Sequence, residues 1–227
     1  MCVTIRIDES ALFAGRVMLA YACVRGVTVI RGSPESDRIL KETEEKVRRT
    51  YDIEKLRKDP VVKALRKCYW KLGIDPTKQR PASEALVRRV LRGRSLPRIN
   101  NVVDAGNAVS LLTLVPIGIY DLGHVRGSLV LRAAREGEEF RPIGGEPERL
   151  TSRQIVLADE EKVLHVFPYR DSVLTMVRND TIDVLIVACG VEGMNPDLVV
   201  EAAHRTAELV TQLAGGEAGE VLKAGEL

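Results

Sequence analysis

The 227-residue sequence has almost no net charge, few cysteines and no cysteine motif of a metal site. Its 34 Lys and Arg residues are balanced by 32 Asp and Glu residues, which excludes a protein that attracts nucleic acid through an overall basic field. Any contact with RNA must therefore come from local patches. The four cysteines, Cys2, Cys23, Cys68 and Cys189, are far apart, and we expect reduced, mostly buried thiols in a cytoplasmic protein.

Signals for export or membrane insertion are also lacking. The fairly apolar stretch at 11–30 is interrupted by Arg16 and Arg25, and no basic segment precedes it. These features predict neither a secretory signal nor a membrane span. Asn and Gln are sparse while Arg, Glu and Val are abundant, which favours a thermophilic source.

The short motifs of nucleotide-dependent and serine-hydrolase chemistry do not occur. Neither GxxxxGK[ST] nor GxGxxG is present, which disfavours nucleotide-dependent chemistry. There is no GxSxG elbow, and His124, His165 and His204 fit a loop, a strand and a helix surface better than a catalytic triad. We expect no metal and no cofactor.

The order of predicted elements indicates an α+β fold. Strands are expected at 1–7 and 17–31, a helical layer at 34–67 with a break at Asp59-Pro60, and helices at 82–92, 101–114 and 197–214. Between the last two helices, strands are expected at 117–120, 128–134, 138–143, 154–158, 162–167, 173–178 and 183–189. This order predicts one domain, 1–214, with a mixed, largely antiparallel sheet packed against helices. Residues 215–227 are rich in Gly and Glu, and we expect a flexible tail.

The helix at 101–114 carries the most informative pattern. Asn100 and Asn101 supply its N-cap, and Asp104 follows Asn101 at the spacing of a capping box. Asp104, Asn107 and Ser110 recur every three positions on a helix that is otherwise small or apolar, so they share a face. That face either meets solvent, with Asp104 acting only as a cap, or forms a pocket wall that binds a substrate amine or hydroxyl.

Two further clusters each allow a structural and a functional interpretation. Arg80 and Arg88 flank the start of the helix at 82–92 and either border an ordinary helix start or bind phosphate. Asp171 and Ser172 follow Pro168 between two predicted strands, where they are either turn residues or loop residues of a site.

Linked segments within residues 75–190 resemble the B3/B4 editing domain of the phenylalanyl-tRNA synthetase beta subunit. The run Asn101-Val-Val-Asp104-Ala-Gly-Asn107 resembles the family's Asn-x-Val-Asp-x-x-Asn, and Pro116 to Leu122 resembles its Pro-x-x-x-x-Asp-Leu. The strand ending at Arg135 and the segments 141–149 and 155–159 resemble the elements that follow. Several motifs in the same order make the likeness more specific than any one of them.

The resemblance implies a pocket and a set of roles. Asn101, Asp104 and Asn107 would line the pocket, with Ser110 and Asp121 beside it, and Glu146 or Glu148 would match an acidic residue near the reacting ester. In this reading Asp104 or a glutamate is catalytic, and Asp171, Ser172 and the residue at 118 contact substrate. The synthetase domain has a histidine where this chain has Gly118, so the chain accepts a different amino acid, recognises it differently or has lost hydrolysis.

These implications yield three alternatives. In the first, the chain hydrolyses the ester of a mischarged aminoacyl-tRNA in trans, with Arg80 and Arg88 on RNA phosphates; such a second sieve is needed where a pocket cannot reject a near-isostere. In the second, it binds an amino acid, a nucleoside or RNA without catalysis. In the third, it is a scaffold whose polar helix face meets solvent.

Overall fold

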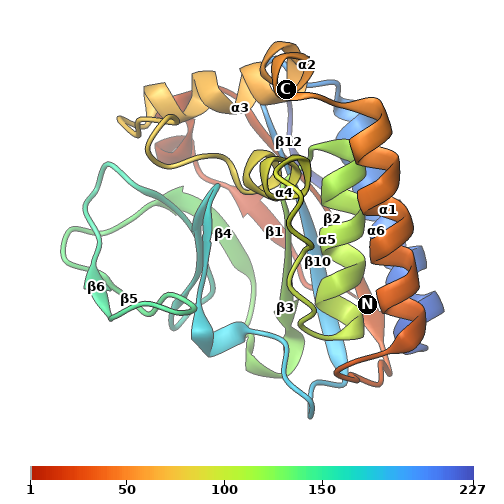
Figure 1. Cartoon of the computed structure of the whole chain (residues 1–227). Helices are drawn as coiled ribbons and strands as arrows, with labels where there is room; N and C mark the ends of the chain where they lie inside the picture. The colour runs from red at the N-terminus through yellow and green to blue at the C-terminus, as the bar shows by residue number, and fades with distance from the viewer. Residues whose placement is uncertain (1) are drawn as a thin grey trace.

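The computed structural model describes residues 2–227 (Figure 1). Its α-helices are α1 (Pro34–Thr50), α2 (Ile53–Lys58), α3 (Pro60–Lys71), α4 (Ala82–Leu91), α5 (Asn101–Thr113) and α6 (Pro196–Ala214). Short 3-10 helices span η1 (Glu9–Ala14), η2 (Leu122–His124) and η3 (Val173–Thr175). The predicted break at Asp59-Pro60 is confirmed, because the Asp59 carboxylate accepts a hydrogen bond from Val61 N at 2.9 Å and starts α3 where α2 ends.

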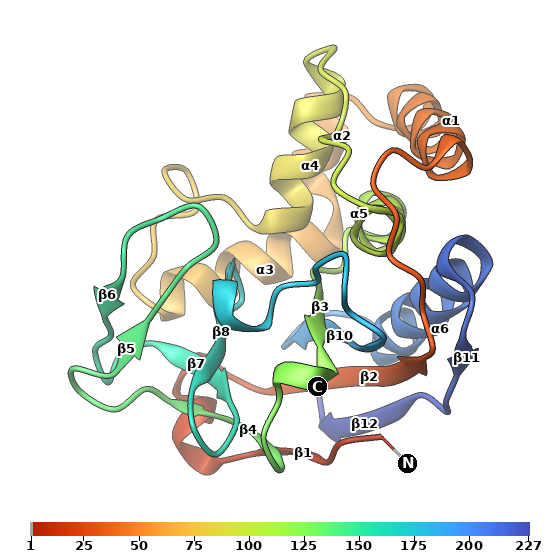
Figure 2. The same cartoon turned by 90° about the horizontal axis from the view of Figure 1, so that it is seen from below.

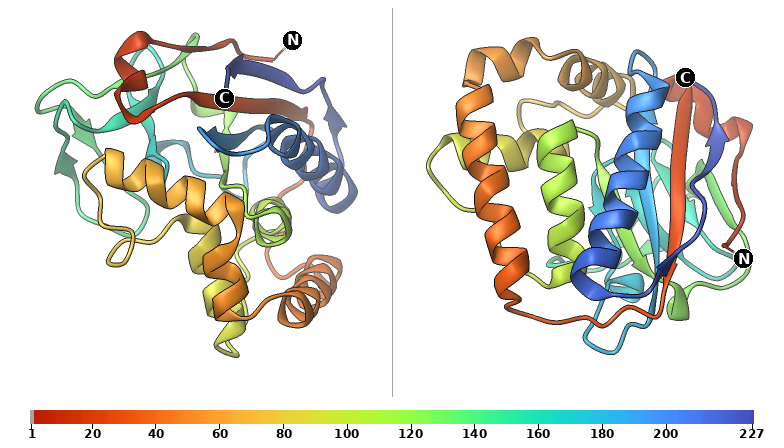
Figure 3. Two further views of the ribbon diagram at one scale, coloured as in Figure 1. Left: turned by 90° about the horizontal axis from the view of Figure 1, so that it is seen from above. Right: turned by 90° about the vertical axis from the view of Figure 1, so that its right-hand side faces the viewer.

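A central antiparallel sheet is built on β2 (Val17–Arg25). It pairs with β10 (Asp183–Val191), which pairs on its other side with β3 (Ile117–Asp121). The other edge of β2 pairs with β11 (Glu217–Ala218) and β12 (Leu222–Gly225). Helices α5 and α6 cover one face of this sheet, and α1 packs outside α5 (Figure 1; Figure 3, right).

A second sheet lies on the opposite side of the central sheet from α5 and α6 (Figure 1). Its strand order is β1 (Ile5–Ile7), β4 (Leu129–Ala133), β7 (Ile155–Ala158), β8 (Val163–Phe167) and β9 (Arg170–Asp171). The β1–β4 pair is parallel and the other pairs are antiparallel. A separate hairpin joins β5 (Glu139–Phe140) to β6 (Glu148–Arg149). The predicted α+β class with mixed, largely antiparallel sheets is confirmed.

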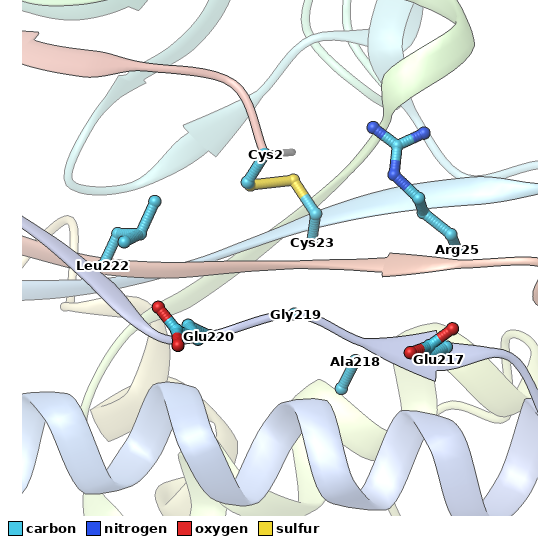
Figure 4. A pocket seen from close by; sticks show the side chains of 8 residues that line it. All are labelled: Cys2, Cys23, Arg25, Glu217, Ala218, Gly219, Glu220 and Leu222. Atoms are coloured by element: carbon cyan, nitrogen blue, oxygen red, sulfur yellow. A yellow bond between two sulfur atoms is a disulfide. The ribbon is translucent and has the colours of Figure 1, made fainter.

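Three local predictions are wrong. Residues 173–178 are not a strand, because the Ser172 hydroxyl accepts a hydrogen bond from Leu174 N and caps the 3-10 helix η3. The segment 215–227 is not a free tail, because β11 and β12 hydrogen-bond along β2. The four cysteines are not all reduced: Cys2 and Cys23 form a disulfide beside this C-terminal segment (Figure 4), while Cys68 and Cys189 are free and buried.

Within residues 2–227, no helix combines the length and apolar character needed to cross a lipid bilayer.

Candidate functional site

A cavity of about 260 Å³ opens between α5, β3 and the segment that follows β8. Its walls are mainly aliphatic and come from Ile99, Val103, Ile117, Ile119, Ile143, Met176 and Val177. Asn107, Tyr120 and Asp171 supply its polar groups, and Gly106 completes the helical wall. We call this space the α5–β3 cavity; Figure 2 shows the three elements that surround it. A mostly apolar recess with a few convergent polar groups is typical of a small-molecule site.

Asp171 forms the polar end of the α5–β3 cavity. Its Oδ1 accepts a hydrogen bond from the Tyr120 hydroxyl at 2.9 Å and lies 2.8 Å from Nδ1 of His165. The Asp171 side chain is 38% exposed, and its Oδ2 makes no hydrogen bond with any described residue. One carboxylate oxygen is therefore fixed by the protein, and the other is free to pair with solvent or a ligand.

Burial and the Asp171 carboxylate both raise the pKa of Tyr120 well above its usual value. Tyr120 therefore stays protonated and donates a hydrogen bond to Asp171. His165 is almost fully buried and packs edge-on against the rings of Tyr120 and Phe167, so both donors to Asp171 are held rigidly. A hydrogen-bonded carboxylate of this kind is already oriented before a ligand arrives.

Gly118 has a clear steric role on β3, two positions before Tyr120. A Cβ atom at this position would overlap the Tyr120 hydroxyl, so glycine is required for Tyr120 to reach Asp171. Gly118 does not line the α5–β3 cavity, and it acts through Tyr120. Gly106 is equally constrained, since a Cβ there would lie 2.9 Å from Cδ1 of Ile119 and fill part of the cavity.

Of the three polar residues along α5, only Asn107 lines the α5–β3 cavity. Its half-buried amide makes no side-chain hydrogen bond with the described residues, so its donor and its acceptor are free to pair with solvent or a ligand. Asp104 instead accepts hydrogen bonds from Ser36 Oγ at 2.9 Å and Ile99 N at 3.0 Å. Ser110 donates to the Val115 carbonyl at 2.8 Å. The expectation that all three face one recess does not hold for Asp104 and Ser110.

Asp104 nevertheless shapes the cavity, because its bond to Ile99 N fixes a residue of the cavity wall. The expected capping box is replaced by a different arrangement: Asn100 caps α5 through Val103 N, and Asp104 reaches back to Ile99. Burial raises the pKa of Asp104, while its two hydrogen bonds act in the opposite direction. Asp104 positions the chain that leads into α5 and does not reach the α5–β3 cavity.

Asn101, Asp121 and Ser172 are also buried outside the α5–β3 cavity. The Asn101 amide donates to the carbonyls of Thr28 and Leu213 at 2.9 Å each and so joins α5 to two distant segments. The Asp121 carboxylate accepts from Thr181 Oγ1 and Gly123 N, both at 2.8 Å. These three residues hold the scaffold around the cavity, and each side chain already makes hydrogen bonds within the protein.

The two candidate glutamates lie on the hairpin segment that follows Ile143. Glu146 is exposed and forms no hydrogen bond or ion pair with a described residue, whereas Glu148 is paired with Arg170 at 3.1 Å. Arg170 in turn lies over the Phe140 ring at 5.9 Å from its centroid. Neither glutamate lines the α5–β3 cavity, and Glu146 is the one whose carboxylate is unpaired.

Of the two predicted RNA-binding residues, Arg80 lies just before α4 and Arg88 lies on it. Arg88 Nε donates to the buried carboxylate of Glu84 at 2.6 Å, and Arg66 of α3 makes two hydrogen bonds to the same carboxylate, at 2.8 and 2.6 Å. The carboxylate ties α4 to α3, and its pKa is lowered by both arginines although burial opposes them. Arg80 and Arg88 share a second cavity, of about 300 Å³, with further arginines.

A third cavity, of about 430 Å³, is bordered by the Cys2–Cys23 disulfide and the C-terminal segment (Figure 4). None of the residues predicted for the site lies there. Within the described part of the chain, no group of three or more His, Cys, Asp or Glu side chains is placed to hold a metal ion.

Sequence reasoning missed Tyr120 and His165, the residues that fix Asp171. Tyr120 is 51 positions from Asp171, and His165 lies in an apolar strand pattern, so each looks like a core residue in the sequence. The only local signal is the polar pair Arg170-Asp171, which follows the turn after β8 and forms β9 at the edge of the second sheet.

The chain matches the family model of the B3/4 domain over residues 64–215. It is 30% identical over 175 residues to the phenylalanine–tRNA ligase beta subunit of Methylococcus capsulatus, with 67% of this chain and 22% of that protein covered. It is 29% identical over 150 residues to the corresponding subunit of Symbiobacterium thermophilum, with 56% and 17% covered. The chain thus spans less than a quarter of the length of these relatives.

The solved N-terminal fragment of the phenylalanyl-tRNA synthetase beta subunit from Pyrococcus horikoshii has the same fold. It superimposes with a TM-score of 0.53 over 98% of this chain and 54% of that chain, at 18% sequence identity. The resemblance first seen at residues 75–190 therefore extends across both sheets and the helices that cover them, and the chain belongs to the B3/4 domain family.

Proposed function

We propose that this chain hydrolyses the ester bond of a mischarged aminoacyl-tRNA in trans, with the amino acid held in the α5–β3 cavity. The main supporting observation is that Asp171 and Asn107 line a mostly aliphatic recess, while Asp171 Oδ2 and the Asn107 amide make no hydrogen bond with a described residue. A few polar groups that converge in a mostly apolar recess favour a small ligand that pairs with them.

The chemistry of the cavity fits an aminoacyl ester. Asp171 pairs with the α-ammonium group, and the Asn107 amide holds the ester carbonyl or the terminal ribose. The aliphatic walls take a side chain of apolar character. A water molecule then attacks the carbonyl carbon, the bond to the ribose oxygen breaks, and a proton passes to that oxygen. An aminoacyl ester is already activated, so positioning and electrostatic stabilisation suffice without a nucleophilic side chain.

Glu146 is the proposed source of general-base assistance. It lies three positions after Ile143, a wall residue of the α5–β3 cavity, and its carboxylate is free. Asp171 is less suited to this task, since Tyr120 and His165 already hold its other oxygen.

Incubation with a panel of misacylated tRNAs tests the proposal. We expect deacylation above the buffer rate for at least one member, and a marked loss in Asp171→Asn. Arg153→Ala, a change at an exposed turn residue that does not line the cavity, serves as a control for preparation effects. If no member of the panel is cleaved faster than in buffer, the enzymatic assignment is withdrawn.

The second candidate is a binding module that uses the same cavity without catalysis. It is favoured by the positions of Glu146 and Glu148, which leave Asp171 as the carboxylate that lines the cavity. A thermal-shift screen with non-hydrolysable aminoacyl-adenosine analogues separates the two candidates. Stabilisation without turnover of any misacylated tRNA supports binding alone.

A further inference from the structure

We infer that the arginine-lined cavity on α4 binds phosphate groups of an RNA strand; that its ligand is RNA rests on the proposed function. This arginine cavity has a volume of about 300 Å³. Among residues 2–227 it is lined by Arg80, Ala85, Arg88, Arg89, Arg92 and Arg94. No carboxylate is among the lining residues.

The charges of the arginine cavity are largely uncompensated. Arg88 pairs with Glu84, but it shares this single carboxylate with Arg66, so one positive charge of the three groups stays unbalanced. Arg89 Nε donates to the Ser95 carbonyl at 2.6 Å, which leaves the charge of Arg89 unbalanced. Arg80, Arg92 and Arg94 form no ion pair with a described residue. Arg80 Nε is buried and has no hydrogen-bond partner. A buried guanidinium donor without an acceptor is costly unless a ligand supplies one.

Helix geometry makes this arrangement unfavourable without an anion. Ala85, Arg88, Arg89 and Arg92 follow the spacing of one helical face, so Arg88 and Arg92 are neighbours one turn apart. Like charges at this spacing destabilise a helix, although cations near its C-terminus interact favourably with the helix dipole. Guanidinium groups match phosphate oxygens with two parallel hydrogen bonds, and a bound phosphate therefore removes the repulsion.

The position of the cavity suits a nucleic acid that also reaches the α5–β3 cavity. Arg94 lines the arginine cavity and Ile99 lines the α5–β3 cavity. Because the two residues are five positions apart, their Cα atoms are separated by at most about 18 Å. The connecting segment is fixed, since Leu96 N donates to Glu44 at 2.8 Å and Ile99 N donates to Asp104 at 3.0 Å. Helix α4 packs against α5 (Figure 2). A strand whose terminal ester enters the α5–β3 cavity can thus lay its nearby phosphates along α4.

The net charge of only +2 makes this local cluster, and not an overall field, the source of attraction. Several guanidinium groups spread along α4 fit a chain of phosphates better than a single small anion. In this arrangement the α5–β3 cavity selects the aminoacyl group, and the arginine cavity separately attracts the RNA phosphates.

The test measures, by fluorescence anisotropy, how binding to a tRNA transcript without an attached amino acid depends on salt concentration. The variant Arg92→Ala/Arg94→Ala is compared with the wild type and with Arg153→Ala/Arg205→Ala, which removes the same charge from exposed positions elsewhere. We expect the slope of log K against log salt to fall in magnitude by about 1.4 to 1.8 in the first variant, as for two lost phosphate contacts. The control pair keeps the wild-type slope.

Equal slopes and affinities for the wild type and Arg92→Ala/Arg94→Ala would overturn the inference, as would wild-type protein that binds pyrophosphate but not the transcript. Circular dichroism melting of each variant verifies that it is folded. The proposed function is judged separately, by cleavage of misacylated tRNA. Loss of binding in the variant with no cleavage by the wild type keeps the arginine cavity and removes the hydrolase. If Arg92→Ala/Arg94→Ala binds RNA as tightly as the wild type and still cleaves misacylated tRNA, the hydrolase is kept and the arginine cavity is removed as the RNA site.

Discussion

The substitution Glu84→Gln probes the contact that holds α4, and with it the arginine cavity, against α3. The Glu84 side chain is 0% exposed and accepts hydrogen bonds from Arg66 at 2.8 and 2.6 Å and from Arg88 at 2.6 Å. Removing its charge leaves two largely buried guanidinium groups facing a neutral amide. Loss of one partner from a buried ion pair typically costs about 3–5 kcal/mol, and we expect a decrease of this size in the free energy of unfolding at pH 7.

The pH dependence gives a second, independent signature. The pKa of Glu84 is lowered from its usual 4.5 in the folded protein, so its stabilisation is fully present above about pH 4.5. It is lost as the pH falls through the lower, folded value. The wild type should therefore converge on Glu84→Gln in acid, whereas the two differ most at neutral pH.

Urea denaturation of both proteins between pH 7 and pH 3 measures these effects. The matched control is Glu45→Gln, which removes a carboxylate from an exposed i,i+4 pair with Arg49 and should change stability little. A Glu84→Gln protein as stable as Glu45→Gln at pH 7, or a difference that does not shrink in acid, would refute the reasoning. An unchanged m-value shows that both proteins unfold from comparable native states.

Three further predictions concern other contacts. Gly118→Ala should lower the free energy of unfolding by about 1–3 kcal/mol, because its methyl group displaces the Tyr120 hydroxyl; a neutral effect in urea denaturation would contradict the steric role. Reduction of the Cys2–Cys23 disulfide, which spans 21 residues, should cost about 3 kcal/mol, measured against Cys2→Ala, which reductant should leave unchanged. Ser36→Ala should lower the free energy of unfolding by about 1–3 kcal/mol, since it removes a buried hydrogen bond to Asp104. The variant should still be stabilised by aminoacyl-adenosine analogues in a thermal-shift assay. If that stabilisation is lost while the free energy of unfolding is unchanged, Asp104 has a direct role in binding.

The sequence predicts the elements of this fold better than their partners. Apolar patterns identify β2 and β10, which are buried on both faces, and α6, which is buried along one face. It fails for residues 215–227, where the composition is that of a loop and the order comes from pairing with the edge of β2. Such pairing depends on contacts about 200 positions away in the chain, which no local pattern contains.

The polar pattern of α5 shows the same limit at the level of the site. Spacing correctly places Asp104 and Asn107 on neighbouring parts of one helix surface, but it does not reveal that α1 covers the first of them. Ser36, the partner of Asp104, is 68 positions away. Asn107 and Asp171 were identified as candidates and do line one cavity, whereas their support by Tyr120 and His165 required the folded arrangement.

The central claim is that the α5–β3 cavity receives the aminoacyl group. Val103 lines this cavity from α5 and is only partly buried, so Val103→Phe narrows the space while leaving the arginine cavity untouched. The most direct measurement is the deacylation rate of misacylated tRNA by the wild type and by Val103→Phe, with binding of uncharged tRNA measured in parallel. We predict that the wild type cleaves at least one misacylated tRNA, and that Val103→Phe loses this activity but binds uncharged tRNA normally. Equal cleavage by the two proteins would show that the aminoacyl group is held elsewhere.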